Sequence, residues 1–323
     1  MSYGLYPLKF APVYKDYLWG GDRISRKYGR KLPAGTYAES WEISDRPEGM
    51  SVVTSGSLAG QTLGALVKEF GDRLVGKGAS GDRFPLLVKI IDAHARLSVQ
   101  VHPSDENASS VGGEPKTEMW YVLGARAGAK VFVGFRSGVD RAAFEKAVQQ
   151  KAAGKTLEPV LVKPADAILV PGGVVHCIDA GLLLLEIQQN SNTTYRVYDW
   201  DRTGPDGKPR QLHMAEALRV MTWTEGGSAK SVRHKSVRAG RNTVWDVLEC
   251  PYFRVERLDL GEDFQGENDG RSFHAFFVTD GEVTLDTRQA GVRMKAGVSC
   301  LVPASAKRYG LAPVNGTAQV LRI

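Results

Sequence analysis

Short runs of β-branched and aromatic residues, separated by glycine, proline and aspartate, follow one another along most of this chain. The pattern predicts strands, because such side chains suit a pleated, half-buried surface and the intervening residues favour turns. The clearest predicted strands are residues 84–91, 98–102, 119–123, 130–135, 167–170 and 182–188. A chain built this way is expected to be mainly β, with its strands in packed sheets.

Three stretches carry the helical spacing of apolar residues instead. The first is predicted at 63–70, with Thr62 as its N-cap and Gly71 as its end. The second is predicted at 137–151, beginning at a serine of capping type, and the third at 214–221. The apolar side of all three is expected to pack on the core.

An internal repeat indicates that one β-unit is used twice. Residues 163–171 resemble residues 295–303, and residues 120–124 resemble residues 276–280, at offsets of 132 and 156. The difference between the offsets matches the length of the stretch that holds the second predicted helix, so the first copy has a helical insertion. We therefore expect two jelly-roll units with a few helical insertions. The polar, basic stretch 226–240 is the predicted boundary, which gives domains at 1–225 and 240–323.

Composition and charge narrow the class of protein. Hydrophobic residues make up 42% and charged residues 24%, which are globular proportions. The net charge of +6 suits an anionic small molecule, whereas the basic stretches are too interrupted to predict a nucleic-acid partner. The 3 cysteines are far apart, so no disulfide framework and no thiolate zinc site are expected. No secretion signal or membrane-spanning run is recognisable, and a cytoplasmic protein is the expectation.

Four polar residues of the first copy are expected to converge: Gln100, His102, Glu118 and His176. Gln100 and His102 are two positions apart in a predicted strand and therefore point to the same face. Glu118 starts the next predicted strand, and His176 follows a tight Pro-Gly-Gly turn. Two imidazoles and a carboxylate are costly inside a β-barrel unless they are paired or bind a metal. Nitrogen and oxygen donors of this kind favour a divalent ion, zinc first. The alternative for each histidine taken alone is an ordinary buried side chain.

At these residues the sequence resembles the short-form class I mannose-6-phosphate isomerases of the cupin superfamily. The resemblance covers nearly the whole chain. It is most specific in residues 97–103 (LSVQVHP), 116–121 (KTEMWY), 170–176 (VPGGVVH) and 195–202 (YRVYDWDR). It implies two cupin-type jelly-roll units, with the metal-binding catalytic one at 1–225 and a degenerate one at 240–323. It also implies one zinc ion per chain held by Gln100, His102, Glu118 and His176.

The resemblance further implies the residues that act on the substrate. Arg196 matches an active-site arginine, Glu186 a carboxylate proposed for proton transfer, and Lys116 a lysine of the substrate pocket. Lys89, Ser98, Lys116 and Arg196 are the expected contacts of the substrate and its phosphate. From the residues alone, Glu186 could also be a solvated strand end and Lys89 a lysine whose amine reaches out to solvent.

The implied reaction is the interconversion of mannose 6-phosphate and fructose 6-phosphate through an enediol. Glu186 is the expected base, with a zinc-bound water as the rival, and Arg196 stabilises the enediolate or holds the phosphate. The partner is a phosphorylated hexose, with no nucleic acid and no membrane, and the chain is a monomer or a homodimer. Two other functions compete: a different metal-dependent cupin enzyme, such as an iron dioxygenase, and a non-catalytic sugar-binding cupin.

Overall fold

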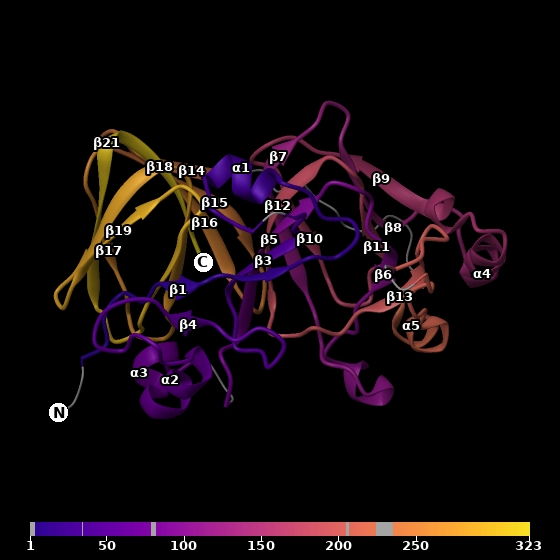
Figure 1. Cartoon of the computed structure of the whole chain (residues 1–323), viewed down its shortest axis with the longest axis horizontal. Helices are drawn as coiled ribbons and strands as arrows, with labels where there is room; N and C mark the ends of the chain where they lie inside the picture. Colours follow the sequence, from indigo (N-terminus) through magenta and orange to yellow (C-terminus); the bar gives the residue numbers. More distant parts are fainter. Residues whose placement is uncertain (1–3, 34, 79–81, 205–206, 224–234) are drawn as a thin grey trace. The chain divides into compact units, whose positions relative to one another are not determined.

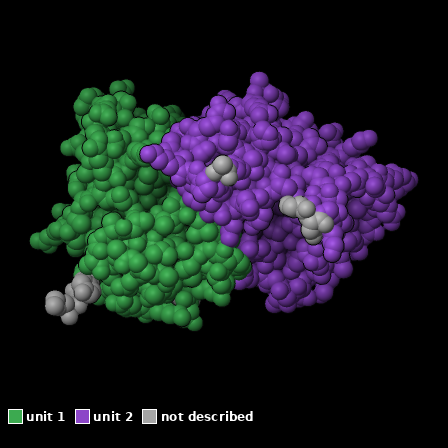
Figure 2. Space-filling view, in the orientation of Figure 1, with its two compact units in different colours: residues 1–13, 41–87, 232–323 green, residues 14–40, 88–231 purple. Residues whose placement is uncertain are grey.

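The computed structural model describes residues 4–33, 35–78, 82–204, 207–223 and 235–323. The fold is mainly β, as the sequence predicts (Figure 1). The chain divides into two compact units, coloured separately in Figure 2. Unit 1 comprises residues 1–13, 41–87 and 232–323, and unit 2 comprises residues 14–40 and 88–231. Each unit thus draws on distant segments of the sequence, and the functional division into 1–225 and 240–323 stays a prediction.

Two sheets carry the strands around the predicted metal residues. The first consists of β10 (Ala167–Val170), β7 (Glu118–Ala125), β12 (Leu182–Gln189), β5 (Leu86–Ala93), β3 (Glu39–Ile43) and β2 (Val13–Lys15), in that order. The second consists of β13 (Tyr195–Tyr198), β6 (Val99–Val101), β11 (His176–Ile178), β8 (Lys130–Phe135) and β9 (Leu157–Leu161). The predicted strands at 130–135 and 167–170 are confirmed to the residue, and the others within a few positions.

Alternate side chains of these two sheets meet in one buried core of unit 2. Trp120 of β7 and Leu184 of β12 belong to the same cluster as Val131 and Val133 of β8. Strand alternation explains this, because every second side chain of a strand points to the same face. The two sheets therefore pack face to face as a barrel whose interior is filled with side chains.

The eight-stranded sheet of the C-terminal segment belongs to unit 1. Its main path is β14 (Lys235–Ala239), β15 (Asn242–Glu249), β16 (Arg254–Leu260), β21 (Arg308–Arg322), β18 (His274–Thr287) and β19 (Gly291–Lys295). In addition, β17 (Phe264–Glu267) pairs with β21, and β20 (Ser299–Val302) pairs with β18. A short pair is formed by β1 (Phe10–Ala11) and β4 (Val52–Val53). Buried side chains of β16, β18, β20 and β21 form one hydrophobic cluster.

Strand register supports the internal repeat. In unit 2, Val170 of β10 lies opposite Glu118 of β7. In unit 1, Val302 of β20 lies opposite His274 of β18. The sequence offset of 132 relates Val302 to Val170, and the offset of 156 relates His274 to Glu118. The same offsets relate every pair of the two ladders, so the two pairs of strands are equivalent elements of the two units.

The helices agree with the sequence in position, with one correction. They are α1 (Arg23–Tyr28), α2 (Leu63–Phe70), α3 (Asp72–Val75), α4 (Arg141–Gln149) and α5 (Met214–Val220), with 3₁₀ turns at Ala108–Val111 and Ala153–Thr156. The hydroxyl of Thr62 caps α2 at Ala65 N, and Gly71 ends it. The prediction that the second helix begins at Ser137 was wrong. The carboxylate of Asp140 accepts from Ala143 N and caps α4 there, because the helix starts where a side chain reaches its free N–H groups.

Apolar side chains of α4 and α5 pack on the outer face of the five-stranded sheet. Phe144 of α4 and Ala217 of α5 share a cluster with Val99 and Val101 of β6.

Of the predicted boundary 226–240, residues 226–234 lie outside the described residues, and Lys235–Ala239 form β14. All three cysteines are free, as expected. No described helix is long and apolar enough to cross a membrane.

Candidate metal centre and active site

Adjacent strands bring the predicted metal residues together. His176, the first residue of β11, lies directly opposite Gln100 of β6, and Arg196 of β13 lies opposite Gln100 on the other side. Residues opposite each other in a ladder point to the same face. His102 follows β6 immediately and shares the face of Gln100, while Val99 and Val101 pack on the other side, as predicted.

Glu118 completes a compact group with the two histidines. One ligand atom from each of His102, Glu118 and His176 lies within 4.8 Å of the others. Both Nε2 atoms are 3.4 Å from a carboxylate oxygen of Glu118. All three residues are at most 1% exposed. The neighbouring Cys177 points away into the apolar core, as predicted.

Backbone carbonyls fix the tautomer of both imidazoles. His102 Nδ1 lies 2.8 Å from the carbonyl oxygen of Thr193, and His176 Nδ1 lies 2.9 Å from that of Val174. A carbonyl only accepts, so each Nδ1 carries the proton and each Nε2 presents a lone pair to Glu118. Burial lowers the pKa of His102 to about 3, with a contribution from Lys116, and burial also lowers the pKa of His176. Both imidazoles are therefore neutral at neutral pH.

Glu118 is a buried carboxylate held in its charged form. Burial acts to raise its pKa, but the nearby Lys116 ammonium and His102 hold it well below the ordinary value. Glu118 Oε2 has an ion-pair partner in Lys116 Nζ, 2.6 Å away, yet accepts no hydrogen bond from the described residues. The Lys116 ammonium offsets the charge of Glu118, and two neutral imidazole nitrogens face the same carboxylate. The donor set thus fits a divalent metal ion.

Gln100 borders the group through its amide nitrogen. Gln100 Nε2 lies 3.2 Å from His176 Nε2 and donates to its lone pair. The amide oxygen accepts from Ser98 Oγ at 3.1 Å. Ser98 is buried and holds the amide of Gln100 in this orientation.

Glu186 and Lys89 form a buried ion pair in the same barrel. Lys89 Nζ lies 3.2 Å from Glu186 Oε2 and 3.7 Å from Glu39 Oε2. Trp120 Nε1 donates to Glu186 Oε1 at 3.2 Å. Glu186 and Lys89 are only 3% and 4% exposed. The alternatives of a solvated strand end and of a lysine reaching solvent are therefore wrong, because each charge finds its partner on a neighbouring strand.

Lys116 contacts two of the three metal candidates, and Arg196 lies opposite Gln100 in the neighbouring strand. Lys116 Nζ lies 3.1 Å from His102 Nε2, besides its ion pair with Glu118. Arg196 Nη1 donates to the carbonyl oxygen of Gln211 at 3.1 Å, which ties the arginine to the segment between β13 and α5. Arg196 Nε is buried and has no hydrogen-bond partner among the described residues.

Two contributors to the site went unpredicted. Trp120 lies two positions after Glu118 on one strand, so alternation could have placed its indole beside the carboxylates. The Thr193 carbonyl, which orients His102, gives no signal in the sequence because any residue supplies a carbonyl.

The observed barrel with its buried His-Glu-His group is that of a cupin-type enzyme with a candidate metal centre.

Comparison with known proteins defines the family. A model of the type I phosphomannose isomerase catalytic domain matches residues 7–127, and a model of the mannose-6-phosphate isomerase cupin domain matches residues 243–323. The chain therefore belongs to the class I mannose-6-phosphate isomerases, which confirms the family and the enzyme class that the motifs predict.

Individual relatives agree with this assignment. The mannose-6-phosphate isomerase ManA of Bacillus subtilis is 35% identical over 307 residues, which are 94% of each chain. The mannose-6-phosphate isomerase of Streptococcus mutans is 42% identical over 258 residues, 79% of each chain. A crystal structure of mannose 6-phosphate isomerase from Bacillus subtilis matches with a TM-score of 0.89 and 29% identity, covering 98% of this chain and 99% of that one.

Proposed function

We propose that this chain interconverts mannose 6-phosphate and fructose 6-phosphate by moving a proton between C1 and C2 of the open-chain sugar. Family membership supports the reaction, and the buried group of His102, Glu118 and His176 is the observation that carries it. A carbon-bound proton is weakly acidic, so the site must stabilise the negative charge that develops on the neighbouring oxygen.

Zinc is the metal that we propose for this group, with one ion per chain. His102, Glu118 and His176 would hold it through two neutral nitrogens and one carboxylate oxygen. Gln100 would join them through its amide oxygen after a half-turn of the amide, which exchanges the oxygen and nitrogen positions. When bound, such an ion acts as a Lewis acid toward the sugar oxygens.

Glu186 is the proposed base for the carbon-bound proton. Burial raises its pKa, with a further contribution from Glu118, and a carboxylate with a raised pKa is a stronger base. Trp120 donates to one of its oxygens and Lys89 pairs with the other, which fixes the orientation of the carboxylate. The rival base is a metal-bound water, and exchange of substrate protons with solvent in a Glu186→Gln variant distinguishes the two.

The cationic residues divide between binding and positioning. Arg196 can bind the phosphate or the enediolate oxygen with its planar guanidinium, whose Nε is unpartnered among the described residues. Lys116 lies at the metal candidates and is proposed to contact the substrate. Lys89 and Ser98, expected to contact the substrate, are bonded to Glu186 and Gln100, so we propose that they position these residues.

A coupled assay tests the proposal directly. The purified chain is given mannose 6-phosphate, and fructose 6-phosphate is measured with a coupling enzyme. Turnover that needs a divalent ion is expected. Oxygen uptake without isomerisation would indicate another metal-dependent cupin enzyme, and binding without turnover a sugar-binding protein. A cytoplasmic location and the choice between monomer and homodimer stay predictions.

A further inference from the structure

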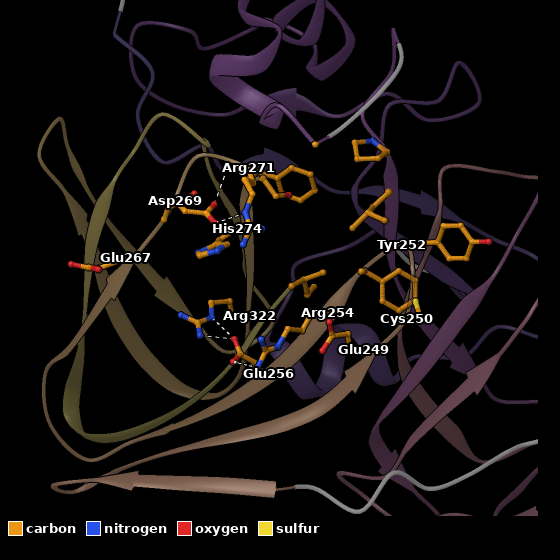
Figure 3. Close-up of a pocket in the computed structure, with 18 of the residues that line it drawn as sticks. Glu249, Cys250, Tyr252, Arg254, Glu256, Glu267, Asp269, Arg271, His274 and Arg322 are labelled. Carbon is orange, nitrogen blue, oxygen red and sulfur yellow. Dashed lines mark hydrogen bonds and ion pairs between the residues drawn. The ribbon is translucent and has the colours of Figure 1, made fainter.

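A cavity of about 1030 Å³, lined by both polar and apolar side chains, lies within unit 1 (Figure 3). Its lining includes His274 at the start of β18, Arg322 at the end of β21 and Glu256 of β16. Asn268 and Lys307, from the segments that follow β17 and β20, line it as well. The mechanism proposed for unit 2 uses none of these residues.

Strand register makes two of these residues counterparts of the catalytic group. His274 is the counterpart of Glu118. His274 lies opposite Val302 in unit 1, and Glu118 lies opposite the equivalent Val170 in unit 2. Arg322 lies opposite Phe276 just as Glu186 lies opposite Trp120, and Phe276 and Trp120 are themselves equivalent by the offset of 156.

The charges at these counterpart positions are reversed. Unit 2 presents the carboxylates of Glu118 and Glu186, and unit 1 presents an imidazole and a guanidinium instead. The buried pair of Glu186 with Lys89 has its counterpart in Arg322 Nε and Glu256 Oε2, which are 2.7 Å apart. A site built from carboxylates attracts a cation, so the reversed set favours an anion.

One ring nitrogen of His274, Nε2, is open to a ligand. Arg322 Nη1 donates to Tyr309 Oη at 2.8 Å, because a guanidinium cannot accept. Tyr309 Oη lies 2.9 Å from His274 Nδ1 and can donate its own proton there. In that arrangement neutral His274 carries its proton on Nε2. That N–H has no hydrogen-bond partner in the described part of the chain.

Asn268 and Lys307 add two further donors. Asn268 is 5% exposed, and its Oδ1 accepts from Gly270 N at 2.8 Å. Its Nδ2 is buried and has no partner among the described residues. Lys307 Nζ donates to the carbonyl oxygen of Asp269 at 3.0 Å, and no carboxylate of the described residues lies within ion-pair distance of it. A buried amide donor without a partner is costly, and an oxygen-rich ligand would satisfy it.

The carboxylates of the cavity are mostly neutralised already. Glu256 pairs with Arg322 and Arg254, Asp269 with Arg271, and Glu267 Oε1 lies 3.5 Å from Arg308 Nε. Glu249 is the remaining acidic residue of the lining. The open hydrogen-bonding capacity is therefore on the donor side.

We propose that this cavity binds a small molecule through a phosphate group, with His274 Nε2, Asn268 Nδ2 and Lys307 Nζ as its donors. Phosphate oxygens are strong acceptors, and charge-assisted hydrogen bonds to them are the strong ones. Free phosphate and the phosphate of a sugar share this chemistry. None of these three donors belongs to the catalytic group of unit 2.

Calorimetric titration of the full-length chain tests the proposal. Inorganic phosphate, mannose 6-phosphate and unphosphorylated mannose are titrated into the wild type, Lys307→Ala and Asn268→Ala/Lys307→Ala. Lys295→Ala is the matched control, because it removes the same charge from an exposed position of β19 in the same unit. In the wild type, we expect a phosphate site beyond the catalytic one. Its affinity should fall about tenfold in Lys307→Ala, and it should be lost in the double variant.

The isomerase kcat and KM, the mannose titration and Lys295→Ala should all be unaffected. Equal affinity for inorganic phosphate and mannose 6-phosphate at this site identifies phosphate alone as sufficient, and tighter binding of the ester identifies a sugar phosphate. The proposal is overturned if phosphate binding is the same in the wild type and both variants. Because Lys307 is exposed, its single substitution keeps the test valid even if the double variant fails to fold.

Discussion

Lys89 Nζ and Glu186 Oε2 lie 3.2 Å apart inside the barrel of unit 2, and both side chains are almost fully excluded from solvent. Burial acts to lower the pKa of Lys89, but Glu39 and Glu186 outweigh it and raise that pKa. The lysine is therefore charged, and it holds the proposed base through this charge. Each partner makes burial of the other tolerable.

Removing one member of this pair should cost much of the stability of unit 2. Lys89→Met leaves Glu186 charged and uncompensated, and we expect a loss of about 3–5 kcal/mol in the free energy of unfolding. Urea denaturation measures it. Lys89→Met/Glu186→Gln should recover part of the loss, because no buried charge of this pair remains. A single variant as stable as the wild type would show that the ion pair does not contribute.

Metal removal should abolish isomerisation. After treatment with a chelator, we expect loss of turnover and recovery on addition of zinc. His176→Ala should lose the metal, measured by elemental analysis, because it removes one of two neutral nitrogen donors. His94→Ala is the control, since His94 is exposed and away from the metal candidates. Full activity of metal-free protein contradicts the proposed role of the metal.

Arg196→Ala should lower kcat by about 10²–10³-fold, the usual cost of losing a group that stabilises developing charge. Metal content should stay that of the wild type, because Arg196 is not among the proposed ligands. Arg238→Ala, at an exposed position of β14, is the control for loss of one positive charge. Steady-state kinetics decide the matter. Unchanged kinetic constants in Arg196→Ala would remove this residue from the catalytic machinery.

The stability of unit 1 should fall as the pH falls from about 6.5 to about 4. Burial and the facing Arg322 lower the pKa of His274 from 6.5 to about 4, against an opposing effect of Asp269, while Tyr309 bonds its Nδ1. Between these two pH values, His274 is protonated in the unfolded chain and neutral in the folded chain. Neutral His274 makes its full contribution to the free energy of unfolding above the pKa of the unfolded chain. Up to about 3 kcal/mol of that free energy is lost once the pH is below the pKa of the folded chain.

A His274→Gln variant isolates this effect, because glutamine does not titrate. The free energy of unfolding, measured across that pH range, should depend less steeply on pH in the variant than in the wild type. His94→Gln should keep the wild-type slope, since His94 is exposed. Equal slopes for His274→Gln and the wild type contradict the prediction.

Gly20 should not tolerate a side chain. A Cβ at this position would overlap Ala38 N and lie 2.7 Å from Ala38 Cα, and backbone atoms cannot rotate away as a side chain can. We expect Gly20→Ala to destabilise unit 2 by about 1–3 kcal/mol in thermal or chemical denaturation. Gly4→Ala is the matched control, with nothing within 4 Å of its added carbon. A neutral Gly20→Ala would show that the backbone shifts at little cost.

Local patterns predicted the strands well because side-chain alternation is a property of a few consecutive residues. The strands at 130–135 and 167–170 have the bounds that the sequence indicates, and Gln100 and His102 share a face as their spacing requires. The start of α4 was mistaken because two capping residues, Ser137 and Asp140, precede it. Only the geometry of the chain selects which of them reaches a free N–H group.

The amino-acid sequence by itself determined the donor set, His102, Glu118 and His176, and the two-fold use of one strand pattern. Tertiary structure decided which imidazole nitrogen is free, through carbonyls of Thr193 and Val174, and decided that Lys89 is buried against Glu186. The reason is physical: alternation and turns depend on neighbours in the chain. Burial, ionisation and the direction of a lone pair depend on partners that only folding brings within a few ångströms.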